Sequence, residues 1–301
     1  MVESSRWTVR GRRVFGMAGP SVAEELTGAV GAPLVLVDRP GWRVEYADER
    51  TARSGTVRFV GPVAAGSPSA VELRWTDGGL SSLMRDRANS APLTATAPVL
   101  GTFAHVYFRH GPGRQKISGL WESLTGLVLE FVAIVNDLDE FVDLLGSLRM
   151  VEESAWLDAL PPSTVRPADR ASVVLSMLNG VSTPPGFDPS TIKGAGLVKD
   201  RYQLGAAVAG TVAWTWFQRW SVARATGDAD GVREAINAMA TAKTWPILLE
   251  MAERGAYPDV LQRYAAAMPS GRWHDRPLEG DVNNGLGCPA LGLPLSNPDT
   301  T

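Results

Sequence analysis

Residues 200–220 read DRYQLGAAVAGTVAWTWFQRW, and this stretch predicts a long helix at the centre of an apolar helical core. Asp200 stands where an N-cap is expected, because its carboxylate can accept hydrogen bonds from the free backbone amides of the first turn. Gly227 is placed to end the helix, since glycine adopts the left-handed conformation at little cost. Apolar or small residues occupy nearly the whole circumference, so the helix is expected to be buried among other helices.

A membrane span is the competing interpretation of this stretch. The uncharged run extends from Tyr202 to Gln218, but it contains a second glutamine near its start and two threonines. Its strictly apolar part is shorter than the roughly 20 residues that a bilayer requires, so we predict no transmembrane span.

Shorter helices are expected around the central one. A second helix over 232–243, capped by Asp228 or Asp230, follows a short join and predicts an antiparallel hairpin. Two further helix starts, at Trp245 and Tyr257, each pair an aromatic residue with a following proline, which is favoured in the first helical turn.

The composition is that of an ordinary globular protein, with 301 residues, 45% hydrophobic and 20% charged. A formal net charge of −3 gives no general attraction to nucleic acid. Cys288 is the only cysteine and there are three histidines, so we expect no intrachain disulfide, no metal site and no cofactor. Residues 1–31 are basic without the apolar segment of a signal peptide, so we expect a cytoplasmic protein.

From Pro33 the hydrophobic pattern changes to a period of two, which predicts half-buried antiparallel strands. The expected strands lie around 33–37, 42–46, 56–59, 71–75, 102–109 and 116–122, with a rim helix over 80–88. Gly126–Val135 is almost entirely apolar, so this strand should be central and covered on both faces. Asn136 is expected to cap a helix that runs to about Gly146 and packs on the sheet.

The order of several runs in this region resembles a known type of domain. The runs are Pro40-Gly-Trp42, Leu120-Trp-Glu122, Leu127–Phe131 and Asp137–Leu148. Together, over about 33–160, they resemble the β-rich sensory domain of transmembrane anti-sigma factors and related sporulation proteins of Gram-positive bacteria. The resemblance implies a sensory or lipoprotein-like binding domain without catalysis, but no clear membrane anchor accompanies it here.

The following region resembles a helical extension found behind similar domains in actinobacterial proteins of unknown function. The matching runs are Thr183–Phe187, Asp200–Gly205 and Ala240–Trp245. This second resemblance implies no particular activity.

These patterns predict an α+β fold, in which an antiparallel sheet with a packing helix precedes an all-helical domain. The expected divisions are a basic entry segment over 1–31, a sheet domain over 32–160, a helical domain over 161–282 and a flexible tail over 283–301.

Few residues offer recognisable chemistry. His105 and His110 stand five apart on an expected strand, which places them on opposite faces as poor co-ligands. His274 precedes Asp275, but adjacent side chains seldom point at each other, and the acids between Asp137 and Asp158 fit a helix start and a solvated face. We therefore predict no catalytic residues.

Candidate binding residues lie on the central helix. Trp214, Trp216 and Trp220 could line a ligand pocket with Arg219 or Arg224 at its mouth, and Tyr202 is a further candidate binding residue on the same helix. The alternative is that these aromatic rings form the helical core, with the arginines at its rim.

The leading functional hypothesis is a non-enzymatic interaction or regulatory protein of actinobacterial type whose partner is another protein. A small-molecule or lipid-binding protein with a pocket between sheet and helix is the alternative, and a hydrolase that uses His274 or the acidic cluster is a third. An exposed apolar patch would favour the first, a large apolar pocket the second, and a converging histidine and carboxylate the third. The sequence leaves the oligomeric state open.

Overall fold

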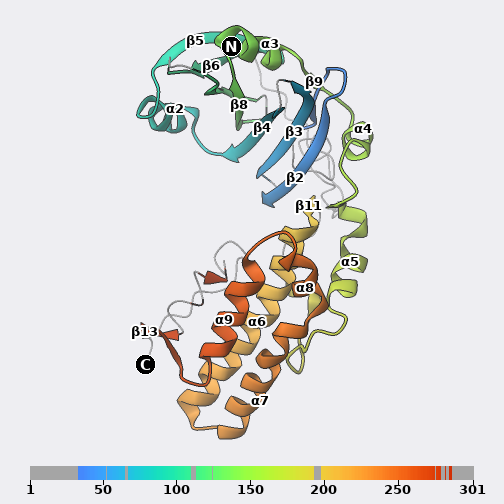
Figure 1. Cartoon of the computed structure of the whole chain (residues 1–301), viewed down its shortest axis with the longest axis vertical. Helices are drawn as coiled ribbons and strands as arrows, with labels where there is room; N and C mark the ends of the chain where they lie inside the picture. The colour runs from blue at the N-terminus through green and yellow to red at the C-terminus, as the bar shows by residue number, and fades with distance from the viewer. Residues whose placement is uncertain are drawn as a thin grey trace, which may run out of the picture.

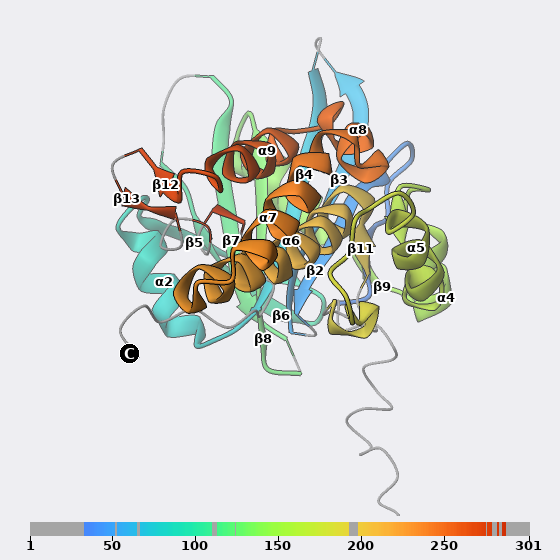
Figure 2. The same ribbon diagram turned by 90° about the horizontal axis from the view of Figure 1, so that it is seen from below.

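The computed structural model describes residues 33–51, 53–64, 67–109, 113–123, 125–192, 198–274 and 276–278, with 282, 285 and 286. Of residues 63, 64 and 67–69 it describes the backbone alone. The fold is α+β. Figure 1 shows the sheet at one end of the long axis and helices α6 to α9 at the other, and Figure 2 looks along this axis from the helical end.

Seven antiparallel strands form the main sheet, in the order β2-β3-β4-β8-β7-β6-β5. The strands are β2 (Arg43–Thr51), β3 (Ser54–Ala64), β4 (Ser67–Asp77), β5 (Leu93–Val99), β6 (Thr102–Tyr107), β7 (Gln115–Glu122) and β8 (Leu127–Val135). The apolar strand β8 is central, as the sequence predicts, and all but one of its residues are buried.

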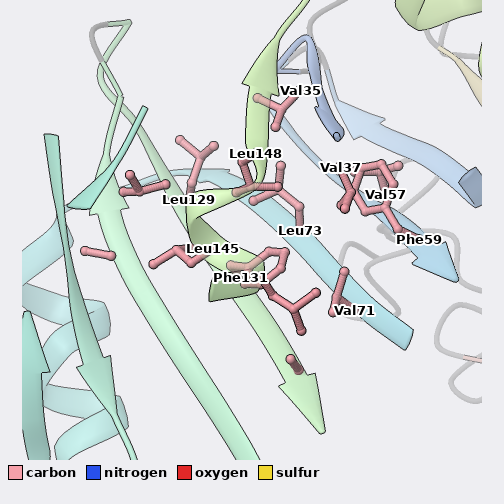
Figure 3. Packing of buried hydrophobic residues seen from close by; sticks show 14 of the residues in the cluster. Val35, Val37, Val57, Phe59, Val71, Leu73, Leu129, Phe131, Leu145 and Leu148 are labelled. Carbon is pink, nitrogen blue, oxygen red and sulfur yellow. The ribbon is translucent and has the colours of Figure 1, made fainter. Parts of the chain in front are cut away.

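The inner face of the sheet carries the larger core. Helix α3 (Leu138–Gly146) and the small sheet of β1 (Val35–Val37) and β9 (Leu148–Met150) cover this face, and Figure 3 shows their side chains interleaving with those of β3, β4 and β8. Phe131 and Phe141 meet there with ring centroids 5.7 Å apart. Gly119 on β7 leaves room for this packing, because a Cβ atom would lie 3.3 Å from the Phe141 ring.

The outer face is only partly covered. Helix α2 (Leu80–Ala88) forms as predicted and lies against β6 and β7, where Leu120 is fully buried although it points away from the inner core. The outer face of β2, β3 and β4 carries polar and charged side chains instead. This uncovered part of the sheet is the region from which a cleft is built.

The start of α3 corrects one expectation. Asp137, not Asn136, is the N-cap, and its carboxylate accepts a hydrogen bond from the Glu140 amide at 2.8 Å. The Glu140 carboxylate in turn accepts from the Asn136 amide at 2.9 Å. Both residues are of types that cap helices, and here Asn136 instead donates to the Glu140 side chain while Asp137 receives the first-turn amide.

The helical region is built around α6 (Arg201–Thr226), as residues 200–220 predict. Asp200 accepts a hydrogen bond from the Tyr202 amide at 2.8 Å, and Gly227 ends the helix with a φ of 73°. The other helices are α4 (Glu153–Asp158), α5 (Arg170–Met177), α7 (Ala229–Ala240), α8 (Pro246–Ala252) and α9 (Tyr257–Ala267), with short turns η1 (Pro167–Asp169), η2 (Pro189–Thr191) and η3 (Thr241–Thr244). Among the described helices, none is long and apolar enough to cross a membrane.

The second helix of the hairpin begins earlier than expected. Asp228 is the cap, and its carboxylate accepts from the Gly231 amide at 3.0 Å, so α7 starts at Ala229 instead of at 232. It ends at Ala240, where η3 takes over.

Two pairs of short strands lie outside the main sheet, one before helix α6 and one after helix α9. Strand β10 (Thr164–Val165) pairs with β11 (Lys199–Asp200) directly before α6, and β12 (Arg272–Trp273) pairs with β13 (Arg276–Pro277) after α9. Strand β11 also contacts β2, the edge strand of the main sheet. The start of the central helix is thereby attached to the sheet.

Candidate functional site

A cleft of about 450 Å³ lies on the outer face of the sheet, where helix α2 leaves β2, β3 and β4 uncovered. Its walls come from four strands and one helix: Tyr46, Arg50, Ser54, Gly55, Thr56, Glu72, Arg74, Trp75, Thr76, Leu83, Arg87, Val128 and Glu130. Most of the lining is polar or charged, and five of these residues are arginines or glutamates. We call this hollow the charged cleft.

Strand register places opposite charges side by side along the charged cleft and beyond its edge, where Glu45 and Arg58 lie outside the lining. Arg58 on β3 pairs in register with Glu72 on β4, and Arg74 on β4 pairs with Glu130 on β8. Cross-strand neighbours of opposite charge attract each other. An alternating ladder of charges results, which runs from Glu45 on β2 through these four residues to Arg87 on α2.

Glu130 and Arg87 form the best-ordered pair of this ladder. Arg87 Nε donates to Glu130 Oε1 at 2.5 Å, and Arg87 Nη2 donates to Oε2 at 2.8 Å. This two-pronged geometry, in which two parallel hydrogen bonds link the charges, is the strongest form of such a pair. The hydrogen bonds that Arg87 donates to Glu130 raise the pKa of Arg87 above its usual range, against the lowering effect of partial burial.

A second group of charges adjoins the charged cleft behind Tyr46. Asp48 on β2 is 7% exposed, and its Oδ1 lies 3.6 Å from Lys199 Nζ, beyond hydrogen-bonding distance. Burial raises the pKa of Asp48 to about 6, although Lys199 and a backbone hydrogen bond from Asp200 oppose the shift. Burial also lowers the pKa of Lys199, and Arg170 adds a repelling positive charge.

Backbone hydrogen bonds hold this second group in place. The Glu49 amide donates to the Val198 carbonyl at 2.9 Å, and the Val198 amide donates to Glu49 Oε2 at 2.5 Å. Lys199 Nζ donates to the Glu49 carbonyl, and Arg254 donates to the Asp200 carboxylate at 3.1 Å. We call this group, around Asp48, Glu49 and Lys199, the junction, because it fixes the start of α6 to the edge strand β2.

The candidate binding residues of α6 lie away from the charged cleft. Trp214, Trp216 and Trp220 are buried in the helical core, where Trp216 Nε1 donates to the Ser182 carbonyl at 2.8 Å. Arg219 lies over the Trp216 ring at 5.7 Å and donates to Glu234 at 3.2 Å. None of these aromatic residues lines a described cavity.

Tyr202 sits at the other end of α6, close to the junction. Its hydroxyl accepts from the Tyr257 amide at 3.1 Å, and Arg254 lies 5.9 Å from its ring centroid. The structure therefore separates Tyr202 from the three tryptophans. A binding role for the five predicted residues stays a prediction.

The histidines and the acidic segment form no joint site in the described chain. His105 lies on β6 with Nδ1 buried and lacking a described hydrogen-bond partner, and His274 is exposed with a φ of 53°. Asp143 and Asp158 pair separately with Arg39 and Arg166. No group of three or more possible metal ligands occurs among the described residues, and His110, Asp275 and Cys288 lie outside them.

The residues of the charged cleft were not identified from the sequence. The only available signal was that Glu72 and Arg74 alternate with apolar residues and must face away from the core. Their partners Arg87 and Glu130 follow from strand order, which the alternation does not reveal.

No protein-family model, curated protein or solved structure matches this chain. The resemblance to anti-sigma-factor sensory domains and to actinobacterial helical extensions therefore stays a prediction. The charged cleft and the junction have to be interpreted from their own chemistry.

Proposed function

We propose that this protein is a non-enzymatic interaction protein with a regulatory role, and that it binds a partner protein through the charged cleft. The observation that carries the proposal is the charged ladder itself, in which arginines and glutamates from three strands and a helix hold one another in place. Fixed charges of this kind confer specificity and orientation on a polar interface.

The chemistry of the charged cleft favours binding over catalysis. Glu130 accepts hydrogen bonds from Arg87 on both oxygens, and Glu72 accepts two from Arg74 on Oε2, so both carboxylates are held as the anions of ion pairs, which weakens them as general bases. His105 and His274 do not line the cleft. These observations leave the hydrolase hypothesis without a strong candidate base in this cleft.

An apolar docking patch has less support than a polar one. Among the residues that the structure describes, the exposed large apolar side chains are Leu93, Phe103, Ile134, Met150, Leu175, Val222 and Leu249. Each lies on a different helix or strand, and single exposed apolar residues are ordinary on protein surfaces. Recognition through charge therefore fits the described surface better.

A small polar molecule is the second candidate ligand. A volume of about 450 Å³ lies within the range of roughly 300–1,000 Å³ that is usual for small-molecule sites, and the cleft lies between the sheet and helix α2. A lipid fits less well, because its chain would have to lie against ionised side chains.

The test is an affinity capture from the source organism with matched variants. Arg50→Glu reverses an exposed charge in the charged cleft, and Arg43→Glu reverses an exposed charge on the same strand outside it. The two positions are roughly 23 Å apart along an extended strand. We expect a stoichiometric partner with the wild-type chain and with Arg43→Glu, and its loss with Arg50→Glu.

The interaction should then be reproduced with purified partner by titration calorimetry. If capture finds no stoichiometric protein, or if Arg50→Glu retains the partner as well as the control does, the proposed partner site is wrong. A small molecule that co-purifies with the wild-type chain but not with Arg50→Glu would favour the second candidate.

A further inference from the structure

We infer that the charged cleft takes the carboxylates of an acidic peptide segment, with Arg50 as the principal contact and Arg74 as the second. This inference rests on the proposed function, because it names the chemistry of the partner at that same cleft. It follows from the balance of hydrogen-bond donors, from the net charge of the lining and from the size of the hollow.

The donors in the charged cleft outnumber the acceptors that are still open. Arg87 occupies both oxygens of Glu130, and Arg74 Nε and Nη2 both donate to Glu72 Oε2. Arg74 Nη1 is left with only a 3.8 Å contact to Glu130 Oε2. Since a guanidinium has five N–H donors, Arg74 keeps hydrogen-bonding capacity for a ligand oxygen.

Arg50 adds a complete guanidinium to this surplus. It lines the charged cleft, is exposed, and makes no ion pair or side-chain hydrogen bond within the described chain. Three arginines face two glutamates in the lining, which leaves one net positive charge. Arginine binds carboxylates with two parallel hydrogen bonds, so an incoming carboxylate fits Arg50 in both charge and shape.

Tyr46 contributes a neutral donor beside Arg50. Burial, and then the charge of Asp48, raise the pKa of the Tyr46 phenol well above its usual range, so that the hydroxyl stays protonated. A protonated phenol can donate to a carboxylate oxygen. Ser54, Thr56 and Thr76 line the same hollow, and their hydroxyl groups can bind backbone groups of a peptide, although Ser54 Oγ also bonds Thr51 Oγ1 and Thr76 Oγ1 donates to the Asp77 carbonyl.

The size of the charged cleft favours a peptide segment over a single small ion. Its volume of about 450 Å³ corresponds to roughly 15 water molecules, far more than one carboxylate group displaces. A short acidic segment can place one side chain on Arg50 and extend its backbone along the neighbouring hydroxyl groups.

The test measures binding of two synthetic peptides, hexaglutamate and hexaglutamine, by titration calorimetry at about 50 mM salt, where charge attraction is weakly screened. The full chain is used as wild type and as Arg50→Gln, Arg50→Glu and Arg43→Glu. We expect hexaglutamate to bind wild type and Arg43→Glu alike, with about tenfold weaker binding by Arg50→Gln and no measurable binding by Arg50→Glu. Unchanged thermal unfolding of each variant would show that the fold is intact.

Equal affinity of wild type and Arg50→Gln for hexaglutamate would overturn the inference, as would equal binding of hexaglutamine. Citrate provides a free carboxylate source in a third arm, and tighter binding of citrate than of hexaglutamate would overturn the assignment to a peptide. If hexaglutamate binds as expected but capture yields no partner, only the proposed function fails. If a captured partner depends on Arg50 but hexaglutamate does not bind, only the acidic-peptide assignment fails.

Discussion

Two ion pairs on the outer face of the same sheet, Arg87 with Glu130 and Lys199 with Asp48, differ in how their partners shift the pKa values. The carboxylates are buried alike, with Glu130 8% exposed and Asp48 7% exposed. In the charged cleft, Arg87 donates two hydrogen bonds to Glu130, and the pKa of Arg87 is raised. At the junction, Lys199 stays 3.6 Å from Asp48, the pKa of Asp48 is raised and that of Lys199 is lowered.

The difference shows that two equally buried carboxylates can differ in how well the geometry of their partners opposes desolvation. A fork of two hydrogen bonds from Arg87 opposes the desolvation of Glu130, whereas Asp48 has a backbone hydrogen bond from Asp200 and a 3.6 Å contact to Lys199, which leave its pKa raised. The charged cleft therefore carries stable charges that a partner can recognise. At the junction, burial disfavours the charged forms of Asp48 and Lys199. We therefore expect the stability of the protein to depend on pH mainly through this group.

The largest effect is expected from Glu49→Ala at the junction. Glu49 is fully buried and accepts the Val198 amide at 2.5 Å, so its removal leaves a buried N–H group unpaired beside Lys199. We expect the free energy of unfolding to fall by about 3 kcal/mol, as measured by urea denaturation. Glu49→Gln keeps an acceptor oxygen, so its free energy of unfolding should fall by less than half of that amount. An equal fall in the two variants would mean that the charge, not the hydrogen bond, stabilises the junction.

The next effect is a pH dependence that Asp48 should impose. Because the folded-state pKa of about 6 lies above the ordinary 3.8, the native state binds the proton more tightly than the unfolded chain. The contribution of Asp48 to stability is thus full below about pH 4 and is lost as pH rises through 6. Arg170, Lys199 and Asp200 are the charged groups that act on it.

Asp48→Asn removes this titration. Relative to wild type, its free energy of unfolding should rise by up to about 3 kcal/mol between pH 4 and pH 7. Urea denaturation at a series of pH values would measure the difference. A constant difference across that range would show that Asp48 titrates normally and that the two ion pairs are alike.

The smallest expected losses of stability come from substitutions in the charged ladder, where a buried glutamate can be compared with an exposed one. Glu130→Gln should lower the free energy of unfolding by about 2 kcal/mol, because Arg74 and Arg87 lose a charged partner that is nearly inaccessible to water. Glu45→Gln breaks the pair with Arg58, whose side chains are both 44% exposed, and should cost under about 0.5 kcal/mol. Similar losses in thermal or urea unfolding would mean that burial adds nothing to the ladder.

Local sequence patterns predicted those helices and strands whose conformation depends little on the rest of the fold. The small and apolar residues of α6, with Asp200 before and Gly227 after them, required a buried helix with those ends. The continuous apolar run of β8 required a central strand. Strand β5 was missed because Leu93–Val99 consists mainly of threonine, alanine and proline, and its conformation depends on pairing with β6.

The same limit applies to the site. The tryptophans of α6 drew attention as binding residues because aromatic rings suit pockets as well as cores, and composition does not separate the two. Packing of helices α5, α7 and α8 around α6 places these rings in the core. The charged cleft could not be predicted from the sequence, because each of its arginines, taken alone, fits an ordinary solvent-exposed face.

The sequence by itself determined that this chain forms an antiparallel sheet and a helical region around α6, because side-chain periodicity and capping are local properties. Only the tertiary structure decided which charges meet. Arg87 and Glu130 are 43 residues apart, and Glu49 and Lys199 are 150 apart, so their contacts depend on strand order and on the docking of β11 against β2. Such long-range pairing arises from the balance of all buried surfaces and hydrogen bonds, which no single stretch encodes.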